Sequence, residues 1–173
     1  MREAYEWIRD IIIALVIAGT VLLFFKPIVV KQESMQPTFY SDDYIVVSRQ
    51  AYNLFGDVER GDVIVFKSKL LNEEGEQKHL IKRVIAVSGD TIEIKDGYVY
   101  VNGEEIEEPY VAEAGISGEM GSVTVEEGKL FVMGDNRRVS QDSRSPELGQ
   151  IDEASIVGKV ILRILPLDSI ETF

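Results

Sequence analysis

The chain has 173 residues, of which 45% are hydrophobic and 28% are charged, with one histidine and no cysteine. This composition excludes a disordered chain, a disulfide scaffold and any site built from thiolates or from several imidazoles. Lys plus Arg number 18 against 30 Asp plus Glu, and the formal charge of -12 opposes nucleic acid as a partner, because nucleic-acid binders neutralise phosphates with cations.

An uncharged apolar segment, residues 11–25 (IIIALVIAGTVLLFF), is the first element along the chain. It is hydrophobic all round, which predicts a helix without an aqueous face. At about 1.5 Å per residue it is about 22 Å long, short of the roughly 30 Å bilayer core. We therefore expect residues 28–30 to add apolar length and Lys26 to reach the interface, with Trp7 and Tyr5 in an interfacial aromatic belt.

Two other interpretations of this segment are weaker. A cleaved secretory signal also has a charged start and a short apolar core, but bulky and charged residues (KPIVVKQESM) stand where its small-x-small cleavage site would lie. A buried core helix is disfavoured because the remaining chain reads as strands and offers no helical layer. We predict a retained signal-anchor, with residues 1–30 as cytoplasmic start and membrane anchor and residues 31–173 as one further domain.

The charges that flank the anchor do not set its orientation. Arg2 and Arg9 precede the apolar segment, and Lys26 and Lys31 follow it. The positive-inside rule therefore gives a nearly balanced count.

The remainder of the chain alternates apolar and polar residues with a period of two, which predicts a mostly β domain. The expected strands cover residues 44–48, 62–68, 79–88, 91–97, 98–106 and 129–135. Residues 70–78 (LLNEEGEQK) are interpreted as a polar hairpin tip, and residues 112–122, with three glycines, as a mobile loop. Five acidic residues between Glu104 and Glu113 are interpreted as a solvated face.

Two residues of the predicted strand 79–88 are candidates for a catalytic base. His79 is the only histidine that a Ser-His-Asp triad could use, but it lies beside the acidic hairpin tip and is interpreted as a surface residue. Lys82 is different, because Lys82 and Arg83 are adjacent cations in an apolar strand and period two puts them on opposite faces. A cation that points inward is costly unless it is neutral or paired. The alternative is an edge strand with protective cations.

Two polar segments, residues 31–39 (KQESMQPTF) and 134–144 (GDNRRVSQDSR), read as loops when taken singly. In order with residues 60–66 (RGDVIVF) and 81–90 (IKRVIAVSGD), and behind an N-terminal anchor, they resemble the bacterial type I signal peptidases. These are membrane-anchored serine proteases that remove signal peptides from exported proteins. The resemblance covers nearly the whole chain, and the single anchor and small size are similar to the Gram-positive form.

The resemblance implies that Ser34 is the nucleophile and Lys82 the general base, in a β-sheet catalytic domain on the extracytoplasmic side of the cell membrane, with no metal or cofactor. It gives the Ser140 hydroxyl the task of orienting the Lys82 amine. Asp142 and Arg144 are expected to form an ion pair that supports their loop. The implied partners are signal peptides of precursor proteins and the lipid bilayer.

A serine–lysine pair needs a neutral amine. A serine hydroxyl is a poor nucleophile until a base removes its proton, and a lysine with a pKa near 10.4 is neutral in only about one molecule in a thousand at about pH 7.4. We expect burial to lower the pKa of Lys82 by about 2 to 3 units. The expected apolar neighbours are Leu80, Ile81, Val84, Val63 and Val65. We expect Arg83 to be a scaffold cation, partnered by Asp135.

The N–H of Ser34 is expected to be one oxyanion donor. The family that the chain resembles commonly carries serine or glycine two residues before the nucleophile, where this chain has Gln32. Its amide can supply the second donor, or its bulk can alter the pocket, and the sequence leaves both open. A smaller departure is Ser88, where a proline is usual. The candidate walls for an extended substrate are Ile28, Val30, Met35 and Ile81, with ordinary core as the alternative.

Two other functions are compatible with parts of the sequence. A membrane-tethered, non-catalytic assembly factor is disfavoured because both the serine and the lysine are present. A self-cleaving, repressor-type Ser–Lys protease is disfavoured by the membrane helix and by the lack of a DNA-binding arm. Eight residues separate Lys26 from Ser34, at most about 28 Å when extended, so the hydroxyl is expected to stay near the bilayer.

Overall fold

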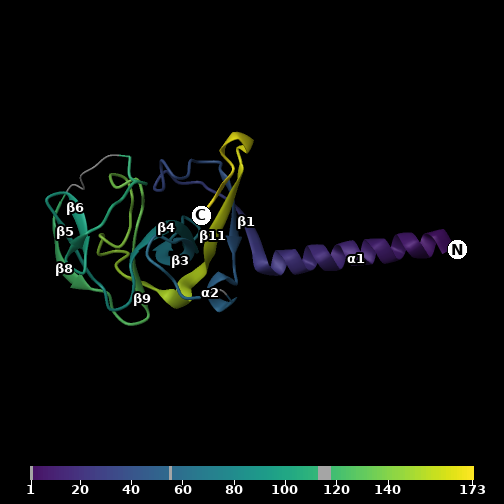
Figure 1. Cartoon of the computed structure of the whole chain (residues 1–173), viewed down its shortest axis with the longest axis horizontal. Helices are drawn as coiled ribbons and strands as arrows, with labels where there is room; N and C mark the ends of the chain where they lie inside the picture. The colour runs from purple at the N-terminus through teal and green to yellow at the C-terminus, as the bar shows by residue number, and fades with distance from the viewer. Residues whose placement is uncertain (1, 55, 113–117) are drawn as a thin grey trace.

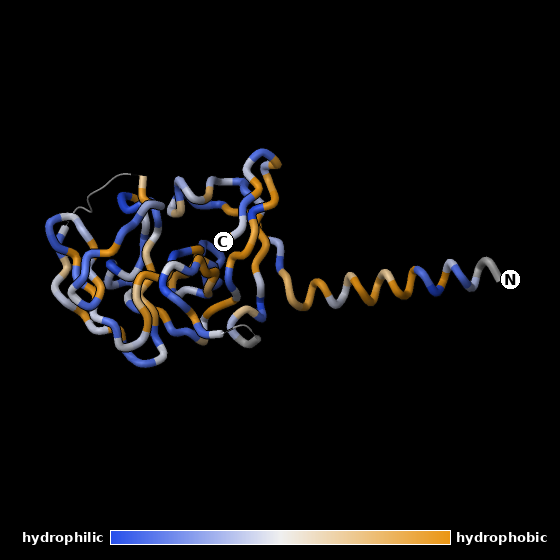
Figure 2. The backbone as a smooth tube through the Cα atoms, in the orientation of Figure 1, coloured by the Kyte–Doolittle hydropathy of each residue, from blue (hydrophilic) through white to orange (hydrophobic). Residues whose placement is uncertain are grey.

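The computed structural model describes residues 2–54, 56–112 and 118–173, which form a long N-terminal helix and a β-rich body (Figure 1). Helix α1 (Arg2–Phe24) extends away from the body. Its residues Tyr5–Phe24 form a span of 20 residues that is apolar and long enough to cross a membrane, and none of its most apolar stretch is buried. In Figure 2 the hydrophobic colour fills the part of the helix that adjoins the body. The most apolar stretch of this helix therefore does not pack against the described part of the body.

The apolar helix ends earlier than the sequence suggested. Strand β1 (Phe25–Val29) begins directly after Phe24 and pairs antiparallel with β2 (Tyr44–Ser48). The expectation that residues 28–30 lengthen the helix is therefore wrong. Pro27 has no N–H to continue the helix, and the β-branched residues that follow it suit a strand. The helix instead gains its length on the N-terminal side, where it begins at Arg2.

The body is built on a large sheet with the strand order β1-β2-β11-β3-β4-β9-β10, in which β12 pairs with β11. The further strands are β3 (Val63–Leu71), β4 (Gln77–Ala86), β9 (Lys129–Met133), β10 (Ile151–Asp152), β11 (Ile156–Leu165) and β12 (Glu171–Thr172). The hairpin tip expected between β3 and β4 is confirmed, because Asn72 accepts the N–H groups of Glu74 and Glu76 there.

A second sheet, with the order β7-β6-β5-β8, lies at the end of the body opposite α1 (Figure 1). Its strands are β5 (Thr91–Lys95), β6 (Tyr98–Val101), β7 (Glu104–Glu105) and β8 (Met120–Thr124). It packs on β4 and β9 through Ile85 and Phe131 among others. The mobile-loop prediction for residues 112–122 is wrong where β8 begins, and residues 113–117 lie outside the described residues.

Two apolar clusters cover the two faces of the large sheet. The Val65 cluster consists of Val30, Met35, Phe39, Ile45, Val47, Val63, Val65 and Val160. The Ile64 cluster consists of Ile64, Phe66, Leu80, Val84, Leu130, Val132, Leu148 and Ile151. Successive residues of β3 thus alternate between the clusters, as a strand buried on both faces requires. Helix α2 (Ala51–Leu54) and two short 3-10 turns, Glu153–Ser155 and Leu167–Ser169, complete the described elements.

The expectation of a mostly β fold with one N-terminal helix is confirmed. The six predicted strand regions all contain strands, and the region 98–106 divides into β6 and β7. Strand β11, which lies between β2 and β3, was not predicted. Its pairing with both neighbours is interrupted by register shifts, so its buried residues do not follow a period of two.

Candidate active site

The sheet brings Ser34 and Lys82 together although they are 48 residues apart in the chain. Lys82 belongs to β4, and Ser34 lies in the turn that follows β1. The Lys82 Nζ and Ser34 Oγ atoms are 2.6 Å apart, and Nζ also donates to the Ile81 carbonyl at 3.0 Å. Lys82 is 1% exposed and Ser34 is 8% exposed. The amine therefore has a hydroxyl within proton-transfer distance and almost no contact with water.

The loop after β9 fixes the backbone of Ser34. The Asn136 N–H donates to the Ser34 carbonyl at 3.0 Å, and the Asn136 side-chain amide donates to the Glu33 carbonyl at 3.2 Å. Gly134 lies so close that an added Cβ would be 2.3 Å from both the Ser34 carbonyl and the Ser140 Oγ. Only glycine fits this approach, which explains why the strand end LFVM is followed by glycine.

The pKa of Lys82 is lowered to about 8, and burial is the largest cause. Asp142 and Asp135 act in the opposite direction, and Arg144 lowers the pKa further. The apolar surroundings differ in part from the expectation. Lys82 pairs with Ile64 and shares its face with Leu80 and Val84, whereas Val63, Val65 and the Ile81 side chain belong to the Val65 cluster on the opposite face.

Asp142 and Arg144 form the expected ion pair, with Asp142 Oδ1 2.8 Å from Arg144 Nε and Oδ2 2.8 Å from Nη2. Asp142 also accepts the Gly134 N–H at 3.0 Å, and Arg144 donates to the Arg137 carbonyl at 3.0 Å. Ser140 departs from the expectation. Its hydroxyl is buried and has no hydrogen-bond partner among the described residues, so the expected hydrogen bond to the Lys82 amine is not formed. The amine is directed to the Ile81 carbonyl instead.

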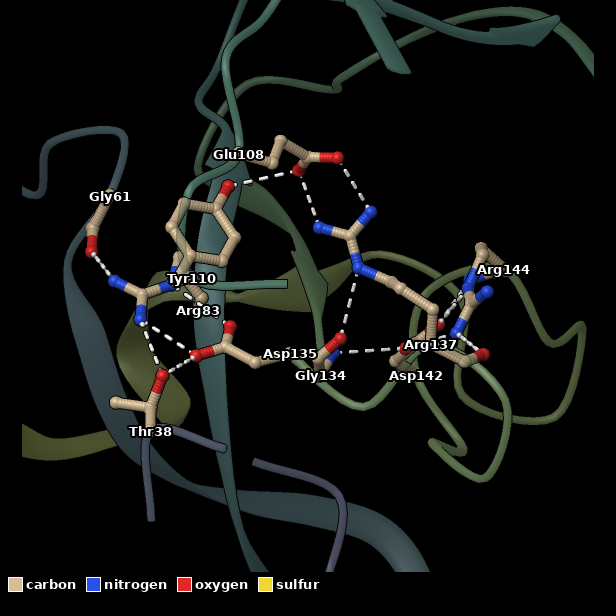
Figure 3. Close-up of polar contacts among 10 residues, drawn as sticks. All are labelled: Thr38, Gly61, Arg83, Glu108, Tyr110, Gly134, Asp135, Arg137, Asp142 and Arg144. Atoms are coloured by element: carbon tan, nitrogen blue, oxygen red, sulfur yellow. Dashed lines mark hydrogen bonds and ion pairs between the residues drawn. The ribbon is translucent and has the colours of Figure 1, made fainter. Parts of the chain in front are cut away.

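Arg83, on the other face of β4, pairs with Asp135 as expected (Figure 3). Nη2 and Nε lie 2.7 Å and 2.9 Å from the two carboxylate oxygens, and Nη1 donates to the Gly61 carbonyl at 2.9 Å. The Thr38 hydroxyl donates to the same carboxylate. This fixes the turn after Ser34 to the end of β9.

Glu108 is a residue of the site that the sequence interpretation missed. The acidic stretch that contains it was interpreted as a solvated face, but Glu108 pairs with the buried Arg137 (Figure 3). Residues 134–144 carry three arginines against two aspartates, but this excess does not say which outside carboxylate pairs with Arg137. Asp135 is used by Arg83 and Asp142 by Arg144, so the buried Arg137 needs a carboxylate from another segment.

A cavity of about 460 Å³ opens beside Ser34. All four candidate wall residues line it: Ile28, Val30, Met35 and Ile81. Val30 and Met35 also belong to the Val65 cluster, so they serve both as core and as cavity wall. Gln32 and the exposed His79 line the cavity as well. The Ser34 N–H donates to no described residue, so it is available to an oxyanion.

A smaller departure from the resemblance, Ser88, takes part in a turn. Its hydroxyl accepts the Gly128 N–H at 2.9 Å and donates to the Lys129 carbonyl at 3.2 Å. Within residues 2–54, 56–112 and 118–173, no three His, Asp or Glu side chains are grouped as metal ligands would be.

Comparison with known proteins gives matches over nearly the whole chain. A family model described as "Signal peptidase, peptidase S26" matches residues 4–165. The chain is 36% identical over 181 residues to Signal peptidase I of Bacillus licheniformis, covering 98% of this chain and 92% of that one. It is 38% identical over 175 residues to Signal peptidase I P of Bacillus subtilis subsp. natto, covering 95% and 91%.

The solved structures include a similar fold. The crystal structure of a signal peptidase I from Enterococcus faecalis V583 is 31% identical, with a TM-score of 0.50, over 60% of this chain and 96% of that chain.

Proposed function

This chain belongs to the signal peptidase family, peptidase S26, and we propose that Ser34 and Lys82 are the catalytic pair with which it cleaves its substrates. The resemblance drawn from four sequence blocks is confirmed, and the chain is a membrane-anchored serine peptidase that removes signal peptides from precursor proteins. The single observation that supports the catalytic pair is the distance of 2.6 Å between a hydroxyl and a lysine amine that is 1% exposed.

The lowered pKa gives Lys82 a base form at ordinary pH. With a pKa of about 8, about one molecule in five carries a neutral amine at about pH 7.4, against about one in a thousand for an unperturbed lysine. The neutral Nζ accepts the Ser34 proton as Oγ attacks the scissile carbonyl. The ammonium then gives this proton to the leaving amine, and an ester forms on Ser34. The amine next takes a proton from water as the water oxygen attacks the ester, and the ammonium returns this proton to Ser34 Oγ as the ester bond breaks.

The oxyanion of each tetrahedral intermediate needs a preorganised donor. The Ser34 N–H takes this role, because the Ser34 carbonyl is held by Asn136 while its own N–H is unused by the described residues. Gln32, whose exposed side chain lines the same cavity, is the candidate for a second donor.

The cleavage segment of the precursor binds extended in the cavity beside Ser34. One wall consists of Ile28 in strand β1 and Val30 directly after it, and β3 and β4 contribute Val65 and Ile81. These residues give the cavity of about 460 Å³ an apolar side, which suits small apolar side chains at alternate positions of an extended peptide, while the rest of its lining is polar or charged.

Helix α1 is the membrane anchor, and the catalytic part lies on the extracytoplasmic side. It begins at Phe25 and not at residue 31 as the sequence suggested, because β1 pairs with β2 of the large sheet. Ser34 follows the end of the helix by ten residues, at most about 35 Å, so the hydroxyl stays near the bilayer surface. A signal peptide is held in the same bilayer by its own apolar core. Shared anchoring therefore raises the effective concentration of the cleavage site at Ser34.

The test uses the full-length chain in detergent micelles and a precursor whose shortened product is followed on a gel. Ser34→Ala, Lys82→Ala and Lys82→Arg should each abolish cleavage, because arginine cannot act as a base near neutral pH. Lys95→Ala, an exposed lysine on the small sheet, is the matched control and should be fully active. Wild-type kcat/KM should rise through pH 8 and then level off. Full activity of Lys82→Arg would contradict the proposal.

A further inference from the structure

The segment after β7 leaves the small sheet and reaches the loop that supports the nucleophile. We call residues 108–110 of this segment the strap. The Glu108 carboxylate accepts hydrogen bonds from both Nη atoms of Arg137, one at 2.8 Å, and from the Tyr110 hydroxyl at 2.9 Å (Figure 3). The side chains of Arg137 and Glu108 are 3% and 14% exposed. Arg137 is thus a buried cation whose charge is balanced by a two-pronged contact.

Arg137 acts on the backbone next to the nucleophile. Its Nε donates to the Gly134 carbonyl at 3.0 Å, while the Gly134 N–H donates to Asp142 at 3.0 Å. Both peptide groups of Gly134 are therefore fixed by charged side chains. Gly134 in turn lies against the Ser34 carbonyl, with no space for a Cβ between them. A shift of Arg137 is transmitted through Gly134 to Ser34.

Tyr110 contacts the other arginine of the site. Its ring centre lies 3.9 Å from the Arg83 guanidinium carbon, which is a cation–π distance. Arg83 is adjacent to Lys82 on β4. The strap therefore contacts both elements that carry the catalytic pair: the loop that holds Ser34, through Arg137, and the strand that holds Lys82, through Arg83.

We propose that the strap positions the reaction: it holds the loop after β9 and strand β4 in the placement that brings Ser34 Oγ to Lys82 Nζ. This inference rests on the proposed catalytic pair. Glu108 and Tyr110 do not touch the reacting atoms, so they are positioning residues and not catalytic ones.

Loss of the Glu108 charge should change the pKa of Lys82. Arg137 would be left buried without a carboxylate, and as it turned toward other acceptors it would release the Gly134 carbonyl. A displaced Ser34 admits water to the amine, and the pKa of Lys82 then rises toward its ordinary value. The other charged groups around the amine are unchanged by this substitution: Asp135, Asp142, Arg144, Glu33 and Lys78.

The experiment measures kcat and KM against pH for Glu108→Gln, which keeps the size of the side chain and removes its charge. We expect kcat to fall by about 10- to 100-fold, as for a small misplacement of reacting groups, with KM little changed because the strap does not line the cavity. The rising limb of the pH profile should move to higher pH, so that alkaline pH restores part of the lost kcat. Glu107→Gln, an exposed neighbour with the same change of charge, is the matched control and should match wild type in both.

Two results would overturn the positioning role. One is a wild-type kcat in Glu108→Gln; the other is a reduced kcat with an unmoved pH limb and a lower thermal midpoint, which would mark a purely structural residue. If Glu108→Gln does not fold, Tyr110→Phe decides, because it keeps the ring over Arg83 and removes only the hydroxyl contact. An upward move of the limb supports the strap and an unmoved limb overturns it. Activity in Ser34→Ala or Lys82→Ala would instead overturn the catalytic pair. Because these variants differ from those that test the strap, the two proposals can fail independently.

Discussion

The neighbouring cations Lys82 and Arg83 lie on opposite faces of strand β4 and have opposite kinds of surroundings. Lys82 points to a face where its polar contacts are a hydroxyl and a carbonyl, and its amine has no ion-pair partner among the described residues. Arg83 points to the other face, where Asp135 meets it with two hydrogen bonds and Tyr110 covers its guanidinium. Both residues are largely buried, at 1% and 9% exposure. The same strand thus holds one cation that favours the neutral form and one that stays charged.

This difference depends on where the carboxylates are used. Asp135 and Asp142 both raise the pKa of Lys82, yet each is already held by an arginine, so burial outweighs them. Arginine suits the paired role because its fork of donors matches a carboxylate and it stays charged. Lysine suits the unpaired role because burial shifts its pKa readily. Among the described residues, Lys82 is the only buried lysine, and its amine has no ion-pair partner there.

The largest effect on stability is expected when the ion pair between Arg83 and Asp135 is removed. Asp135→Ala leaves Arg83 buried without its partner, which should lower the free energy of unfolding by about 3 to 5 kcal/mol. Urea unfolding of the full chain in detergent micelles measures this change. Asp57→Ala, at an exposed position, is the control and should change stability by less than about 0.5 kcal/mol. A loss of stability no larger than that of the control would show that the pair on this face contributes little.

On the face of Lys82, the charged form of the side chain should lower the free energy of unfolding, whereas on the face of Arg83 the ion pair raises it. In the unfolded chain the Lys82 amine has an ordinary pKa near 10.5, and in the folded chain burial lowers it to about 8. Below pH 8 both states bind the proton, and the folded state carries a buried charge. Between pH 8 and 10.5 the unfolded state binds more protons, so the free energy of unfolding rises with pH, by roughly 3 kcal/mol in total.

Lys82→Met removes this titration while keeping an unbranched side chain in the same place. At pH 7 the variant should be as stable as wild type or more stable, and the gap should close as the pH rises toward 10.5. The measurement is urea unfolding of both chains at several pH values, with Lys95→Met as the control for a solvated lysine. Parallel stability curves for wild type and Lys82→Met would contradict a lowered pKa.

Alternation in the sequence predicted most of the sheet but not its pairing. The strands at 44–48 and 79–88 were found from a period of two, whereas β11 was missed because its register shifts disrupt that period. The faces of Lys82 and Arg83 were predicted by alternation alone. Of the expected apolar neighbours of Lys82, Leu80 and Val84 share its face, as alternation requires. Val63 and Val65 do not, because their faces depend on the register of β3 against β4, and Ile81 does not, because alternation turns it to the opposite face.

Some residues of the candidate site were predicted from the sequence and others were not. Ser34 and Lys82 came from the resemblance between ordered blocks, since neither spacing nor composition joins two residues 48 positions apart. The same resemblance suggested a Ser140 contact that is absent among the described residues. Glu108 was missed because its partner Arg137 lies 29 positions away, and local sequence shows an acidic stretch without showing what approaches it.

The smallest effect is expected at Gln32, beside the cavity next to Ser34, where effects on function and on stability separate. Gln32 is exposed and lines the cavity, so Gln32→Ala should leave the free energy of unfolding within about 0.5 kcal/mol of wild type. If its amide donates to the oxyanion, kcat should fall by about tenfold, less than the roughly 100-fold of a buried donor, because water can partly replace it. Gln32→Glu keeps the bulk but has no donor, so it should lose kcat as well. A lower KM in Gln32→Ala with unchanged kcat in both variants would mean that Gln32 only narrows the cavity. In that case the N–H of Ser34 would act on the oxyanion without help from this side chain.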